Sequence, residues 1–171
     1  DPATGASIEP IIEPFRLPPD LDVTLVDSGA AASTADRLAR LELLRRNNPA
    51  AHAAALDPLV DLARAVAARD GAFDLAALQQ WNEALRRLEA ALGLPILTPA
   101  LDAVIDAARA AGGAGKPSGA GGGDLAVLFT PRGDAARLGA ELARRGFAPL
   151  DVRIGARGLH AAPVPGVENA S

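Results

Sequence analysis

The sequence contains no cysteine, no methionine and no tyrosine, and only 3% of its 171 residues are aromatic. Without cysteine, the chain has no disulfide, no thiolate metal site and no cysteine nucleophile. It also lacks an apolar run close to the roughly 20 residues that a membrane-spanning helix needs. The net charge of -4 disfavours a general nucleic-acid surface, although it leaves room for a local basic patch. We therefore expect neither a membrane nor a nucleic acid as partner.

The N-terminus lacks the basic stretch and apolar core of a secretory signal peptide, so a cytoplasmic location is expected. The missing methionine includes the initiator residue, from which we expect a fragment or a processed piece of a longer protein. Hydrophobic residues make up 49% of the chain. A chain of this length is sufficient for one compact domain, with a core built mainly from Leu, Val, Ile and Ala.

Hydrophobic patterning predicts the order strand, several helices, loop, strand, helix, strand. Strands are predicted at 22–28 and 125–130, with one or two more within 148–161. Helices are predicted at 35–48 after a Ser33 or Thr34 cap, from Asp57-Pro58 to about residue 69, at 74–92, from Thr98-Pro99 to Gly112, and at 134–145. This order indicates an α+β fold, in which an antiparallel sheet of about four strands is covered by helices. Residues 1–21 are expected to form an extended N-terminal segment, 22–161 the domain and 162–171 a loose tail.

Residues 115–124, GKPSGAGGGD, are the most unusual stretch of the sequence. Glycine is costly to order, so such a cluster needs a local reason. Successive backbone amides can form a concave nest for an anion, beside which Lys116 supplies a point charge and Ser118 a hydroxyl donor. A flexible linker between a helix and a strand is the alternative. The stretch matches neither GxxxxGK[ST] nor a GxGxxG that opens a helix.

The other candidates for chemistry are weak. His52 and His160 have no acidic or histidine neighbours at ligand spacing, so no metal site is expected. The serines lack a His–Asp partnership, which makes a hydrolase triad improbable. A basic stripe, which faces either an anionic acceptor or solvent, consists of Arg37, Arg40, Arg45 and Arg46.

Two stretches resemble the GHMP kinases. LTPALDAVIDAARAAGGAGKPSGAGGGDLAVLF is similar to their third motif region, most of all in bacterial phosphomevalonate kinases, and DVTLVDSGAAAST resembles a strand and turn that precede a helix. The resemblance runs from about residue 20 to about residue 160 and implies the C-terminal domain of such a kinase, with a ferredoxin-like arrangement. The N-terminal half, with its phosphate loop and catalytic residue, is then an expected partner in the same or a separate chain.

The resemblance also implies the function and its residues. The chain is expected to help transfer the γ-phosphate of ATP, with Mg²⁺, to phosphomevalonate or a related small phosphorylated acid, and to be inactive in isolation. No residue of this chain is assigned a certain catalytic role. The residues implied at the phosphates and the acceptor are Lys116, Ser118, Gly119, Ala120, Gly121, Gly122, Gly123, Asp124, Ser33 and Thr34. For Asp124 a contact to Lys116, a contact to magnesium and a structural role stay open.

A non-catalytic binding or interaction module, which docks a partner through its helical face, is the alternative function. Apolar surface left open by a missing N-terminal half would also favour homodimers.

Overall fold

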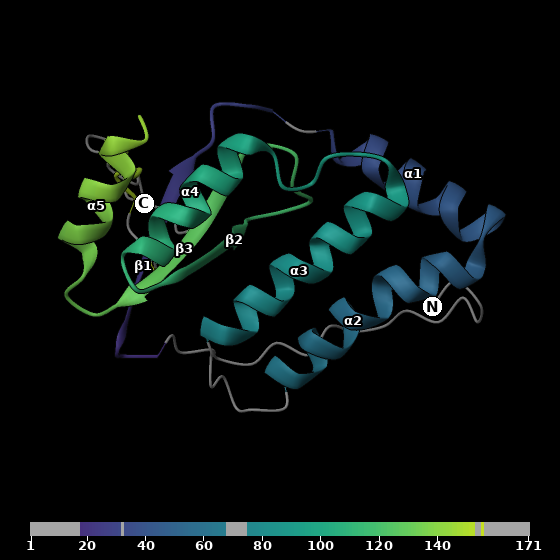
Figure 1. Cartoon of the computed structure of the whole chain (residues 1–171), viewed down its shortest axis with the longest axis horizontal. Coiled ribbons are helices and arrows are strands. Elements are labelled where there is room, and N and C mark those ends of the chain that lie inside the picture. The colour runs from purple at the N-terminus through teal and green to yellow at the C-terminus, as the bar shows by residue number, and fades with distance from the viewer. Residues whose placement is uncertain (1–17, 32, 68–74, 153–154, 156–171) are drawn as a thin grey trace, which may run out of the picture.

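The structure is a computed structural model that describes residues 18–31, 33–67, 75–152 and 155. Figure 1 shows the order of the elements within them: β1 (Leu21–Asp27), α1 (Thr34–Asn47), α2 (Pro49–Ala67), α3 (Leu75–Leu92), α4 (Pro99–Ala110), β2 (Ala114–Pro117), β3 (Leu125–Pro131) and α5 (Ala135–Arg144). The predicted α+β class is confirmed. The boundaries proposed for the N-terminal segment and the tail stay predictions, because residues 1–17 and 162–171 lie outside the described part.

The described sheet is antiparallel, with the strand order β1-β3-β2. The central strand β3 pairs with all of β1 and all of β2. On the other side of β1, an isolated bridge joins Val26 to Pro149, and the Leu150 amide donates to the Leu25 carbonyl at 2.8 Å. The chain thus returns to β1 at the start of the predicted last strand, of which residues 153–154 and 156–161 lie outside the described part.

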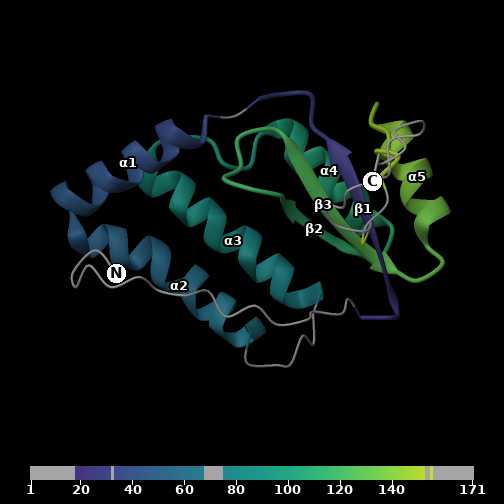
Figure 2. The ribbon, with the colours of Figure 1, turned by 180° about the vertical axis from the view of Figure 1, so that it is seen from behind.

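The two faces of the sheet are covered by different helices, because alternate strand residues point to opposite sides. Helices α4 and α5 cover one face, where the fully buried side chains include Val26, Leu101, Val104, Leu128, Leu138 and Leu142. The N-terminal end of α3 covers part of the other face through Leu78, which packs with Ala114 and Phe129. The view from behind in Figure 2 shows α1, α2 and α3 extending together to one side of the sheet.

The second helix begins earlier than predicted, at Pro49 instead of Pro58. The Asn48 side chain accepts a hydrogen bond from the Ala51 amide at 3.0 Å, so Asn48 caps the helix and proline occupies its first position. Pro58 lies inside the helix, where proline costs about 3 kcal/mol. Alanine-rich residues 50–55 favour helix on its N-terminal side, and Ala55 and Leu59 bury their side chains against α3. The predicted end near residue 69 lies outside the described residues.

Strand β2 was not predicted, because its residues belong to the glycine-rich stretch. Gly113 and Gly115 flank Ala114 at the start of this strand. A Cβ built on Gly113 would overlap the Phe129 carbonyl, and one built on Gly115 would overlap the Leu128 side chain. The two glycines therefore allow a close approach to β3 and do not mark a loop. The loop proper is reduced to residues 118–124.

Candidate functional site

The 118–124 loop joins β2 to β3 and has an unusual backbone. Gly121 and Gly122 have φ of 75° and 78°, and Asp124 is the described non-glycine residue with positive φ, at 56°. Side chains are strained in this region, which explains the run of glycines. Ser118, Gly119 and Ala120 are exposed at the tip of the hairpin. The loop is therefore a defined turn between paired strands, and not a tether.

Hydrogen bonds to three other segments hold this loop. The Gly122 amide donates to the Ile96 carbonyl at 2.6 Å, and the Ser118 amide donates to the Leu125 carbonyl at 2.8 Å. The Asp124 amide donates to the Ala30 carbonyl. Four further loop amides have no acceptor among the described residues, namely those of Gly119, Ala120, Gly121 and Gly123. Gly119 and Ala120 are exposed and can meet a ligand, whereas Gly121 and Gly123 are buried. The sequence predicted that the amides of residues 119–123 form the nest. The Gly122 amide instead faces the protein, so it is not among the donors for a ligand.

The loop lies beside the turn at 28–34, which leads from β1 to α1. The Ser28 amide donates to the Asp124 carbonyl at 2.8 Å, and a Cβ on Gly123 would meet the Ala30 carbonyl oxygen at 2.5 Å. Ser33 ends this turn as the N-cap of α1, and its hydroxyl accepts from the Asp36 amide at 3.2 Å. Ser33 and Thr34 are exposed at the helix start. Two motifs that are far apart in the sequence therefore share one surface.

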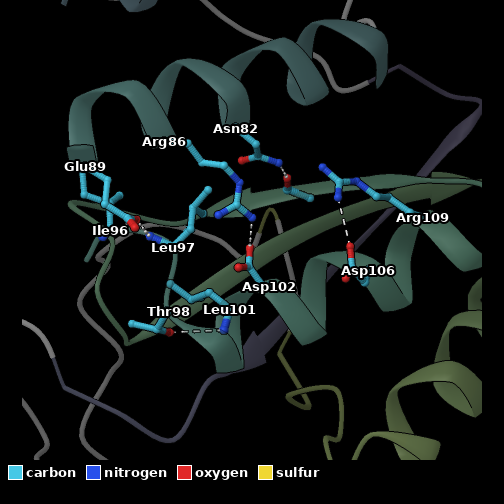
Figure 3. Close-up of polar contacts among 11 residues, drawn as sticks. Asn82, Arg86, Glu89, Ile96, Leu97, Thr98, Leu101, Asp102, Asp106 and Arg109 are labelled. Atoms are coloured by element: carbon cyan, nitrogen blue, oxygen red, sulfur yellow. Dashed lines mark hydrogen bonds and ion pairs between the residues drawn. The ribbon is translucent and has the colours of Figure 1, made fainter. Parts of the chain in front are cut away.

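The connection between α3 and α4, residues 93–98, supports the loop from the opposite side. One carboxylate oxygen of Glu89 accepts hydrogen bonds from the Ile96 and Leu97 amides, both at 2.9 Å (Figure 3). The Ile96 carbonyl, held in this way, accepts the Gly122 amide. Thr98 caps α4 through the Leu101 amide at 3.3 Å, as predicted from Thr98-Pro99. Glu89 thus fixes the 93–98 connection, which in turn holds the glycine loop through Ile96.

Lys116 lies on β2, before the loop, and on the face of the sheet that α3 covers. Its ammonium donates to the Pro117 carbonyl at 2.8 Å. It also lines a cavity of about 260 Å³ with Leu62, Ala63, Val66, Ala77, Leu78 and Trp81. Burial lowers the pKa of the Lys116 ammonium below its ordinary value, because the apolar wall disfavours the charged form. In this structure the Lys116 side chain thus lines the cavity and donates to the Pro117 carbonyl.

Asp124 holds the loop through its backbone, and its carboxylate is exposed. Within the described residues, that carboxylate makes no ion pair with Lys116, whose hydrogen bond goes to Pro117. No group of three or more histidine and acidic residues able to hold a metal occurs in the described ranges. The hydrogen-bond donors at this site are amides and hydroxyls, which suit phosphate oxygens.

Three residues that shape the site were not singled out for this role from the sequence. Asn82 and Glu89 lie on α3, where helical spacing indicated only core and solvent faces. Arg37 was considered only as part of a basic stripe. Arg37 and Asn82 each donate to a backbone carbonyl of a distant segment, and Glu89 accepts from two amides just beyond the end of its own helix. Spacing along a helix carries no signal for such contacts.

Comparison with known proteins identifies the domain. Residues 63–148 match the model of the GHMP kinases C terminal family. The chain is 40% identical over 120 residues to a phosphomevalonate kinase of Streptomyces sp. (strain CL190). The aligned residues cover 67% of this chain and 32% of that relative. The chain therefore spans about a third of the length of that relative.

Solved structures with low sequence identity share the fold. The Lin0012 protein of Listeria innocua matches with a TM-score of 0.70 and 21% identity, over 81% of this chain and 40% of its own. L. major mevalonate kinase, solved with R-mevalonate, matches at 0.65 and 18%, over 79% and 41%. The Streptococcus pneumoniae phosphomevalonate kinase matches at 0.54 and 22%, over 76% and 39%.

None of the helices in the described ranges has the length and apolar character of a membrane span.

The family match extends from α2 to beyond α5 and contains the whole glycine loop. This chain belongs to the GHMP kinases, and carries their C-terminal domain.

Proposed function

We propose that this chain is the C-terminal half of a GHMP-family kinase that transfers the γ-phosphate of ATP to phosphomevalonate or a related acid of the mevalonate type. The 40% identity to a phosphomevalonate kinase supports this acceptor class. The observation that carries the proposal is the junction of the loop and the turn, where the Ser28 amide donates to the Asp124 carbonyl at 2.8 Å. Such a kinase is expected to act in the cytoplasm and to need an N-terminal half, in the same or a separate chain.

Phosphoryl transfer depends on positioning and on stabilisation of charge, because the transition state is loose and spreads charge over the phosphate oxygens. The amides of Gly119 and Ala120, at the exposed tip of the loop, donate to those oxygens, and the Ser118 hydroxyl adds a further donor. The loop backbone is already held by Ile96 and Ala30, so little reorganisation accompanies binding. Magnesium, when bound with ATP, neutralises charge on the phosphates.

The acceptor is placed by the start of α1. The Ser33 and Thr34 side chains lie at the N-terminal end of this helix, where the helix dipole favours an anion. An acceptor with a phosphate or carboxylate at this end lies near the loop, because the Asp124 amide donates to the Ala30 carbonyl. The Lys116 ammonium is proposed to contribute positive charge from β2.

The test uses the natural polypeptide that includes these 171 residues. ADP release is measured with MgATP and phosphomevalonate, and separately with mevalonate. Ala120→Glu adds a carboxylate beside the unpaired loop amides and is expected to lower kcat/KM by about tenfold or more, since it competes with phosphate. The matched control Ala140→Glu, also exposed but on α5, leaves the rate unchanged. Equal rates in both variants contradict a phosphate-binding loop, and no phosphorylation of either acid rejects the proposed substrate class.

Lys116→Ala tests the proposed role of the lysine. Weaker nucleotide or acceptor binding with little loss of stability supports it, whereas unchanged affinity for both removes Lys116 from the site. An interaction module without catalysis is the reading that gains if the wild-type polypeptide binds neither nucleotide nor acid.

A further inference from the structure

Arg37 connects the segments on either side of the glycine loop. It is the fourth residue of α1, and its guanidinium turns back past the start of the helix. One terminal nitrogen, Nη1, donates to the Ser33 carbonyl at 3.0 Å, and the other, Nη2, donates to the Pro95 carbonyl at 3.3 Å. The first acceptor belongs to the 28–34 turn and the second to the 93–98 connection. One side chain therefore spans the space in which the loop lies.

The guanidinium packs directly against the α-carbon of Gly122. A Cβ built on Gly122 would overlap Nη2 and Cζ of Arg37, so this contact requires glycine. On its other side, Gly122 donates its amide to the Ile96 carbonyl at 2.6 Å. Gly122 is thus held between a side chain of α1 and a backbone group of the 93–98 connection.

The charge of Arg37 is not neutralised by any described residue. Arg45 and Arg46 on the same helix share Glu42, at 2.7 Å and 2.6 Å, whereas no ion pair to Arg37 occurs in the described part of the chain. The Arg37 Nε is buried and has no described partner. A buried donor without a partner is costly, so the position of this guanidinium needs a physical reason.

We propose that Arg37 is a positioning residue: its guanidinium clamps Gly122 between the 28–34 turn and the 93–98 connection and thereby sets the direction of the unpaired loop amides. Two donors of one planar group fix the spacing of two carbonyls, which a lysine with a single nitrogen reproduces only in part. The uncompensated positive charge adds to the potential that the loop amides create. That these amides meet phosphate rests on the proposed function, but the clamp itself does not.

The first experiment measures amide hydrogen exchange across residues 118–124 in the natural polypeptide that includes this chain. Arg37→Ala is expected to accelerate exchange at Gly122 and Asp124 by about tenfold or more, with α4 unchanged as an internal reference. Arg37→Lys gives an intermediate effect. The matched control is Arg40→Ala, because Arg40 is exposed on the same helix and has no described partner.

The second experiment measures kinetics on the same variants. A clamp predicts that Arg37→Ala lowers kcat by about 10- to 100-fold, while KM for the phosphorylated acceptor changes by less than about threefold, since misplacement acts on the transition state. Added guanidinium ion should restore part of kcat in Arg37→Ala. The Arg40→Ala control keeps the wild-type kcat, and guanidinium should not change it.

The clamp is overturned by unchanged exchange in the loop, by equal acceleration in α4, or by a raised acceptor KM with unchanged kcat, which indicates direct binding of the acceptor. If Arg37→Ala does not fold, the exchange result for Arg37→Lys decides. If the wild-type polypeptide phosphorylates neither acid, the proposed function fails, and the exchange comparison still decides for or against the clamp because it needs no substrate.

Discussion

The side-chain amide of Asn82 donates a hydrogen bond to the Gly115 carbonyl at 2.7 Å, and so ties α3 to the short strand β2 (Figure 3). Asn82 is only 3% exposed, and its Oδ1 has no described partner. Asn82→Leu leaves the Gly115 carbonyl without its donor, and should lower the free energy of unfolding by about 1–3 kcal/mol. Urea denaturation measures the loss, with exposed Gln79→Leu on the same helix as the control. A loss equal to that of the control would contradict a structural role for this bond.

Glu89 should matter for the loop as well as for stability. Glu89→Ala removes the acceptor of two backbone amides, those of Ile96 and Leu97, and should cost about 2 kcal/mol in unfolding free energy. Because Ile96 holds Gly122, exchange of the Gly122 amide should also become faster. The exposed Glu83 on the same helix provides the control, Glu83→Ala. If Glu89→Ala loses stability but the exchange rate of the Gly122 amide stays the same, then the 93–98 connection does not hold the loop.

Gly123 and Gly139 should respond in opposite ways to alanine. Gly123 has φ of 148°, and a Cβ there would meet the Ala30 carbonyl oxygen at 2.5 Å. Gly123→Ala should therefore destabilise the chain by about 1–3 kcal/mol. Gly139 lies on α5 with open space around its α-carbon, so Gly139→Ala should stabilise by about 0.5–1 kcal/mol. Thermal unfolding compares the two variants. If Gly123→Ala leaves the stability unchanged, then the loop can shift away from Ala30 to accommodate the new methyl group.

Lys116 is the only lysine of the sequence, so its titration can be followed as a single resonance. We expect its amine to titrate below the ordinary value of 10.5, because burial disfavours the charged form. The folded chain then releases this proton at a lower pH than the unfolded chain does. In the interval between the two pKa values the unfolded state binds more protons, so stability rises with pH there.

The titration is measured by NMR, first on the folded chain and then in denaturant, where the ordinary value should return. Lys116→Met should remove the rise in stability. A folded-state midpoint at or above the ordinary value would contradict burial of the amine.

The isolated 171-residue chain is expected not to transfer phosphate from ATP. It spans 32% of the phosphomevalonate kinase to which it is similar, and the proposed phosphate donors account for only one side of a phosphoryl-transfer site. Measurement of ADP release by the purified chain tests this. Turnover that persists after removal of any contaminating kinase would contradict the requirement for an N-terminal half.

Much of the fold could be predicted, because local chemistry and tertiary packing agree there. Ser33 and Thr98 cap their helices as expected, and the runs at 22–28 and 125–130 form the two longer strands. Pro58 misled the prediction of α2, since a proline that starts a helix and a proline inside one look alike locally. The difference lay in Asn48 and in the packing of Ala55 and Leu59 on α3.

By itself, the sequence determined the two longer strands, four of the five helices with the caps at Ser33 and Thr98, and the glycine loop with its likeness to a kinase motif. Only the tertiary structure decided that Gly115 belongs to a strand, that the Gly122 amide faces Ile96, and that Arg37 lies against Gly122. Caps and periodicity depend on neighbours within a few residues, which a sequence displays directly. A hydrogen bond between distant segments depends on how the helices pack, and packing is settled only when the whole core has formed.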